Sequence, residues 1–405
     1  VVQIVHDSLV GGGVGHIVCY NETFVMLKPH TNEEIIKEFG EPTPYTILIP
    51  TKNIKLIMIS LIFSSMGISQ EVKENSRQNG HLNINKFRQM YQEFSSPNMF
   101  RTAAGAPGPA YYQQQADYKM DIELDDRNKR ISGSETITYT NNSPDNLEYL
   151  WVQLDQNVRK KDSPSLIRDG DGVSPAYDPS GFTNKFINEP FDGGFNIEYV
   201  KDLNGKVLTF FINQTMMRVD LPKVLKSGEM FSFSMKWWYN IQDHVNQDGR
   251  SGYETFESDG NRSYIIAQFF PRMAVYNEIE GWQNYQFWGN GEFALPFGNY
   301  EVKITVPADH ILDATGELQN RKEVFSKDML KRYNKAKKSY DKPIMIVTQA
   351  EAEEAEKNFS KDKNTWHFKA QNVRDFAFAS SRKFLWDMMA VKVGNKDVMA
   401  VSLYP

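Results

Sequence analysis

The stretch that decides the fold runs from Gln268 to Asn320, QFFPRMAVYNEIEGWQNYQFWGNGEFALPFGNYEVKITVPADHILDATGELQN. Near its end, apolar side chains occupy every second position: Tyr300, Val302, Ile304 and Val306. This period of two is typical of a strand with one face in the core and one face in solvent, as in antiparallel sheets. Pro307 lacks the backbone donor that a sheet ladder uses, so we expect the strand to end there.

Segments that precede this stretch show the same alternation. Residues 118–124 and 131–139 each place apolar side chains at alternate positions, and the polar cluster 125–128 separates them. Two such runs around a turn predict a long hairpin with one buried face. Residues 151–154 predict the strand that follows. The chain is therefore expected to be mainly β.

A second hairpin is predicted farther along the chain. Residues 217–221 and 231–239 both alternate, and the turn signal Ser227-Gly228 lies between them. The apolar stripe of the second run predicts core packing rather than a cofactor site.

A charged segment at residues 321–357 interrupts the strand pattern. Ser326 can cap a helix that runs to about Tyr340, and Thr348 opens a capping box for a helix that extends through Lys357. Both helices are polar over most of their surface, so we expect a helical insertion that projects into solvent.

The C-terminal part returns to apolar patterns. Trp366 and Phe368 predict a strand, residues 376–389 are interpreted as a helix, and residues 398–403 form a β-rich run. We expect this last part to belong to a new domain.

Composition excludes several classes of protein. The chain has 405 residues and a net charge of −5, and its pI is about 5.9. No basic footprint for nucleic acid exists at this charge. A mean hydropathy of −0.53 excludes a polytopic membrane protein. Cys19 is the only cysteine, so neither an internal disulfide nor a multi-cysteine metal site can form.

The N-terminal residues predict export. Lys52 and Lys55 precede the short apolar run 56–63, and small residues follow before Gln70. These are the parts of a signal peptide, and the run is shorter than the roughly 20 residues of a membrane span. The alternative is a buried core segment. Residues 1–51 then read as a non-native leader, and residues 70–115 as a flexible lead-in.

Candidate catalytic groups are sparse. No two of the seven histidines have the spacing of a zincin motif. Glu278, Glu280 and Glu292 could offer the carboxylate pair of a glycosidase, although sequence does not give their separation. The Asp-Gly repeat at 169–172 lacks the further ligands of an EF-hand and predicts a solvated turn.

Several segments carry a resemblance to a known family. QFFPRMAVYNE, GEFALPFGNYEV and ITVPADHILDATGELQN, together with NVRDFAFASSRKFLW at 372–386, resemble the N-terminal domain of membrane alanyl aminopeptidase-like zinc metallopeptidases. These are gluzincins related to leukotriene hydrolase. The resemblance covers about residues 118–405.

This resemblance implies a large antiparallel β-sheet saddle or sandwich followed by an α/β or α-rich catalytic domain with HExxH. Zinc would be bound there, by ligands downstream of Pro405, and a zinc-activated water would hydrolyse a peptide or protein substrate. The implied division of the chain is a leader at 1–51, a signal peptide at 52–69, a lead-in at 70–115, the β-saddle at 116–376 and the start of a truncated catalytic domain at 377–405. As a fragment without the zinc site, this chain is expected to be inactive, and the protein to be periplasmic or extracellular.

The resemblance also implies one substrate-binding residue, Gln268. Family members often carry an element here whose polar side chains help to hold the amino terminus of the substrate. Gln268 matches it, but Phe270 stands where a polar residue is expected, which weakens the case for recognition of a free amine. Gln268 could instead be a strand-end amide bonded to backbone.

A function from another class also fits these patterns. A non-catalytic β-sandwich could bind peptide or glycan at the cell surface through exposed aromatic side chains. An intact downstream frame with HExxH would distinguish the two.

Overall fold

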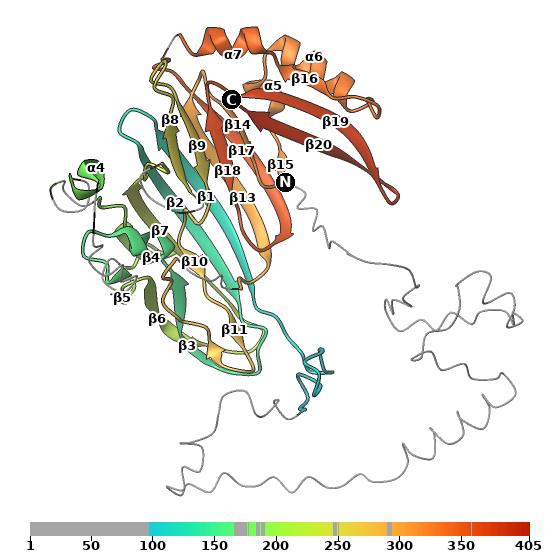
Figure 1. Cartoon of the computed structure of the whole chain (residues 1–405). Helices are drawn as coiled ribbons and strands as arrows, with labels where there is room; N and C mark the ends of the chain where they lie inside the picture. Colours follow the sequence, from blue (N-terminus) through green and yellow to red (C-terminus); the bar gives the residue numbers. More distant parts are fainter. Residues whose placement is uncertain are drawn as a thin grey trace, which may run out of the picture. The chain divides into compact units, whose positions relative to one another are not determined.

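The computed structural model describes residues 97–165, 176, 178–183, 187, 191–245, 249, 251–289, 294–357 and 359–405. The expected leader, the signal peptide, most of the lead-in and the Asp-Gly repeat at 169–172 lie outside these residues. The described part is mainly β, as the alternating patterns predict (Figure 1). No helix in the described ranges is long and apolar enough to cross a membrane.

The largest sheet has seven strands in the order β15-β17-β13-β1-β2-β7-β4. Their bounds are β1 (Gln115–Asp125), β2 (Arg130–Thr140), β4 (Asn196–Asp202), β7 (Met230–Asn240), β13 (Gly298–Pro307), β15 (Glu317–Leu318) and β17 (Lys363–Val373). The predicted hairpin is confirmed as the antiparallel pair β1–β2. β13 ends at Pro307, as its sequence predicts, but pairs with β1 in parallel.

The predicted second hairpin is wrong. Its first strand, β6 (Met216–Leu225), joins a four-stranded sheet with β3 (Leu147–Gln153), β5 (Phe210–Asn213) and β10 (Arg272–Met273), whereas β7 pairs with β2 and β4. The turn that joins them, at Gly228 with φ 77°, carries the chain from one sheet to the other. Alternation identifies the apolar face of each strand but not its partner, and both faces enter one core.

The predicted helix at 376–389 is also wrong. β18 (Phe378–Ser381) lies between β9 (Arg262–Ile266) and β14 (Ile311–Ala314), and β8 (Gly252–Thr255) completes that sheet. β19 (Leu385–Val393) lies between β16 (Ile344–Val347) and β20 (Lys396–Tyr404). Buried Trp386, Met388 and Ala390 alternate with less buried neighbours that are themselves mostly apolar, so the period of two was hidden in the sequence.

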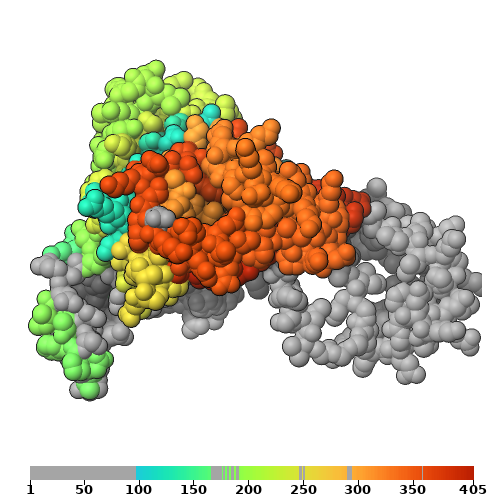
Figure 2. All heavy atoms as spheres, turned by 90° about the horizontal axis from the view of Figure 1, so that it is seen from above, coloured from blue at the N-terminus to red at the C-terminus, as the bar shows by residue number. Residues whose placement is uncertain are grey.

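The helical insertion contains α5 (Arg321–Val324), α6 (Lys327–Ala336) and α7 (Gln349–Ala355). Both expected caps are confirmed: Ser326 Oγ accepts from the backbone N–H of Met329, and Thr348 forms a capping box. The insertion is less solvated than expected, because Met329 is buried and β16 pairs with β19. Figure 2 shows the insertion, in orange, forming much of the surface seen from that side.

Part of the expected lead-in is attached to the β-rich unit. We call residues 97–114 the arm. Arg101 forms an ion pair with Glu278. The side-chain nitrogen of Gln114 donates to Asn141 Oδ1 at 3.1 Å, and its oxygen accepts from the backbone N–H of Asn142 at 2.6 Å. These bonds fix the end of the arm next to β1.

A buried ion cluster joins three connections of the fold. Arg382 follows β18 and is only 1% exposed. Its Nη2 lies 2.9 Å from Asp126 in the β1–β2 turn, and its Nε lies 3.2 Å from Asp309 after β13. Burial opposes ionisation of Asp126, but a hydrogen bond from Tyr264 and the charge of Arg382 outweigh it and lower the pKa of that carboxyl. His310 packs beside this cluster, and burial lowers its pKa to about 4.

One buried carboxyl has no such partner. Glu135, in the middle of β2, faces the core and is 2% exposed. Neither of its carboxyl oxygens accepts a hydrogen bond of ordinary geometry within the described residues, and the nearby indole of Trp237 opposes the effect of burial without outweighing it. Burial therefore raises its pKa well above the ordinary 4.5.

Removal of the central cation of the ion cluster should destabilise the fold. In Arg382→Met, Asp309 would lose its cation and Asp126 would keep only the more exposed Arg262, 3.4 Å away, so the free energy of unfolding should fall by about 3–5 kcal/mol in urea denaturation. Arg218→Met is the control, because Arg218 forms an exposed pair with Asp220 and should change stability by less than about 1 kcal/mol. Equal effects of the two substitutions would contradict this role for the cluster.

Glu135 should make stability depend on pH. Because its folded-state pKa lies above its unfolded value, the folded state holds the proton more tightly, and the free energy of unfolding should fall as pH rises above about 4.5. Glu135→Gln should remove a slope of about 1.4 kcal/mol per pH unit in urea titrations over that range. Glu148→Gln, at an exposed position, controls for the change of residue type. An unchanged slope in Glu135→Gln would refute the assignment.

Candidate functional site

Gln268 lies in the short connection between β9 and β10. Its φ of 52° places it in the left-handed region, which costs a residue with a side chain about 1–2 kcal/mol. The backbone carbonyl of Gln268 accepts from Gln156 Nε2 at 2.9 Å, and Gln156 belongs to the 3-10 helix η3 (Asp155–Arg159). The half-buried side chain of Gln268 forms no hydrogen bond within the part of the chain that the structure describes.

The two residues after Gln268 are fixed in the core. Phe269 and Phe270 are both fully buried. Phe270 packs edge-on against Tyr118 and Tyr300, with ring centroids 5.4 and 6.0 Å away. Phe269 packs against Phe378 at 5.3 Å. Phe270 is therefore a core residue, and the polar contact expected of a family member at its position is missing.

A buried arginine holds the other side of this connection. Arg272, the first residue of β10, is 5% exposed. Its Nη2 lies 2.8 Å from Asp155 of η3, and its Nη1 lies 2.6 Å from Asp375, which follows β17. Burial opposes the charge of Arg272, but these two carboxylates outweigh it and raise the pKa of the guanidinium. Arg272 is thus a fixed cation that ties β10 to η3.

The structure brings Gln268 into contact with Gln156, and Arg272 into contact with Asp155 and Asp375, three residues that sequence reasoning missed. Gln156, Asp155 and Asp375 are separated from Gln268 by about a hundred residues, and each follows a strand without any motif of its own. In the sequence, these residues were marked only by being polar and following a strand, and residues of this kind are common in loops.

Two of the three candidate carboxylates have partners elsewhere in the described chain. Glu278 is paired with Arg101, and Glu280 accepts a hydrogen bond from the hydroxyl of Tyr285 at 3.1 Å. Glu292 lies outside the described residues. No group of three His, Cys, Asp or Glu side chains within those residues could hold a metal ion.

The side chain of Gln268 offers hydrogen-bonding groups but no nucleophile or general base. A free primary amide can accept from an ammonium group or donate to a carbonyl oxygen. Arg272 carries a positive charge, but its guanidinium nitrogens already contact two carboxylates.

No family model matches the chain, and no curated protein matches its sequence. Among solved structures, the M1 zinc metallopeptidase of Deinococcus radiodurans is similar, with TM-score 0.37, 13% identity, and coverage of 72% of this chain and 47% of that one. A mutant of that enzyme bound to a Tyr-Ser-Ala substrate gives TM-score 0.38, 12% identity, and coverage of 72% and 48%.

A two-domain M1 zinc metallopeptidase mutant bound to L-tryptophan is similar at the same level, with TM-score 0.38, 12% identity, and coverage of 74% and 50%. The chain spans about half the length of these solved structures. Likeness this distant carries no argument about activity.

The left-handed conformation of Gln268 predicts an unusual tolerance for glycine. Gln268→Gly should change the free energy of unfolding by less than about 0.5 kcal/mol, because relief of backbone strain offsets the added flexibility of the unfolded chain. Gln268→Val should cost about 1–2 kcal/mol, since β-branched residues avoid this region. Urea denaturation measures both.

Lys119→Gly is the control for this prediction. Lys119 is exposed in the middle of β1, where glycine should cost about 0.5–1 kcal/mol. A loss in Gln268→Gly as large as in Lys119→Gly would contradict the strain at Gln268.

Proposed function

We propose that the β-rich unit is the N-terminal domain of an exported zinc metallopeptidase of the aminopeptidase type, and that Gln268 contacts the substrate of that enzyme. The observation that carries the proposal is the unpaired side-chain amide of Gln268, on a backbone that the surrounding core holds in the left-handed region. Strain of this kind persists only where the surroundings impose it. The sequence resemblance of residues 268–320 and the mainly β fold also support it.

Gln268 would act by binding rather than by chemistry. Its neighbours Phe269 and Phe270 are fixed in the core, and its carbonyl is held by Gln156, so the backbone has little freedom. A side-chain amide on such a support can accept from the ammonium group of a peptide without a large loss of entropy on binding. Phe270 cannot supply the second polar contact, so recognition of a free amine would depend mainly on Gln268.

The described residues do not fit a zinc site. No cluster of His, Cys, Asp or Glu among them has the composition of one. The ligands in this proposal would come from a region downstream of Pro405. Sequencing of the coding DNA beyond codon 405 tests this. In-frame HExxH, followed about twenty residues later by a glutamate, would support the peptidase. A stop codon or unrelated sequence would overturn it.

The role of Gln268 can be measured in the protein with that downstream region. Gln268→Ala should raise KM for an aminoacyl p-nitroanilide about tenfold or more, because a hydrogen bond to a charged group is worth about 1.5–3 kcal/mol, and should leave kcat unchanged. Gln371→Ala, at an exposed position on β17, is the matched control. An unchanged KM in Gln268→Ala would remove Gln268 from the substrate site without affecting the zinc assignment.

A further inference from the structure

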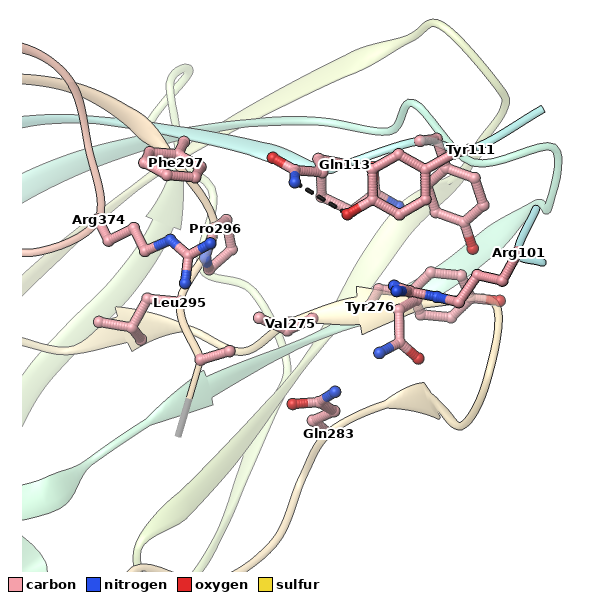
Figure 3. A pocket seen from close by; sticks show the side chains of 14 residues that line it. Arg101, Tyr111, Gln113, Val275, Tyr276, Gln283, Leu295, Pro296, Phe297 and Arg374 are labelled. Atoms are coloured by element: carbon pink, nitrogen blue, oxygen red, sulfur yellow. Dashed lines mark hydrogen bonds between the residues drawn. The ribbon is translucent and has the colours of Figure 1, made fainter. Parts of the chain in front are cut away.

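A pocket of about 280 Å³ lies between the arm and two later segments of the chain. The arm contributes Arg101 and residues 111–114. The hairpin of β11 (Tyr276–Asn277) and β12 (Gly281–Trp282), with its flanking residues, forms a second wall. Residues 294–297 and Arg374 close the remaining side (Figure 3). The pocket thus depends on the arm being attached to the β-rich unit.

Positive charges outnumber negative charges in the lining of this pocket. Its lining includes two arginines and no carboxylate. Arg101 is compensated by the nearby Glu278. Arg374 is exposed and forms no ion pair with any residue that the structure describes; its guanidinium carbon lies 4.4 Å above the ring centroid of Phe297. Figure 3 shows this guanidinium beside Pro296, on the opposite side of the pocket from Arg101.

One further donor on the pocket wall lacks a partner. The side-chain amide of Gln283 forms no hydrogen bond within the described ranges. An occupant that accepts hydrogen bonds could pair with this amide.

Gln113, Gln114 and Asn277 also line the pocket, and their side chains form hydrogen bonds within the chain. The remaining lining residues are apolar or aromatic. Val275, Leu295 and Phe297 provide apolar surface, and the rings of Tyr111 and Tyr276 lie near Arg101 (Figure 3). Apolar walls with a few convergent polar groups are typical of small-molecule sites, and the volume of about 280 Å³ is just below their usual range of roughly 300–1,000 Å³.

We propose that this pocket binds a small carboxylate with an apolar or aromatic body, and that Arg374 receives the carboxylate. A planar guanidinium can pair with both carboxylate oxygens at once, which favours Arg374 over a single neutral donor as the charge-recognising group. The apolar body would rest against Val275, Leu295 and Phe297. Both a free carboxylic acid and the carboxyl terminus of a peptide have this chemistry. The site does not depend on peptidase activity.

Ligand-observed NMR titration of the 405-residue chain with phenylacetate tests the proposal. A ligand of this size should bind with a Kd on the order of 1–10 mM. Phenylacetamide, which keeps the ring and loses the charge, should bind roughly tenfold more weakly or not at all. Acetylated Ala-Phe as its free acid and as its C-terminal amide distinguishes the two sources: tighter binding of the acid than of phenylacetate would identify a peptide terminus as the occupant, and weaker binding would identify a free acid.

Variants locate the binding. Arg374→Gln should weaken phenylacetate binding roughly tenfold or more, and Arg374→Lys should retain part of it. Arg130→Gln is the matched control, because Arg130 is also exposed and stacked, 4.2 Å above the ring of Trp238, but does not line the pocket. No binding by the unaltered chain, equal binding of phenylacetamide, or equal losses in Arg374→Gln and Arg130→Gln would each overturn the proposal.

Discussion

The parallel pairing of β1 with β13 is the constraint on which the described structure depends. It places Tyr118 opposite Tyr300, and their rings stack with centroids 4.7 Å apart. Every other pair in the seven-stranded sheet is antiparallel. A parallel neighbour requires the chain to leave the sheet and return, and here the excursion contains the second sheet and the pocket hairpin. Both candidate sites are therefore built from segments that this one pairing brings back to β1.

The connection around Gln268 follows from the same arrangement. Phe270 packs against Tyr118 and Tyr300, so the stacked pair at the centre of the sheet also fixes the residues beside Gln268. Arg272 then ties β10 to η3 through Asp155. Gln268 lies between a fixed aromatic core and a buried ion pair, so its backbone has little room to leave the left-handed conformation. The strain at Gln268 is a consequence of core packing, and its unpaired amide is what makes it a candidate for binding.

The sequence predicts which face of a strand is buried better than it predicts which strands pair. Alternation correctly identified the strands β1, β2, β7 and β13, since each buries every second residue. It could not show that β6 and β7 belong to different sheets, because both orient apolar side chains towards one core. It failed for β19, where most of the outward residues are also apolar. Pairing with β16 and β20 decided that segment, and such pairing is a tertiary property.

The sites were predictable to a smaller extent, and three arginines show why. Arg382 and Arg272 are buried and surrounded by carboxylates from distant segments, so their charge serves the fold. Arg374 is next to Asp375 in the chain, but that carboxylate contacts Arg272, and Arg374 forms no ion pair with any residue that the structure describes. In sequence the three residues look alike. Only the distribution of carboxylates in space separates a structural cation from one that can receive a ligand, and that distribution is set by strand pairing that no local pattern encodes.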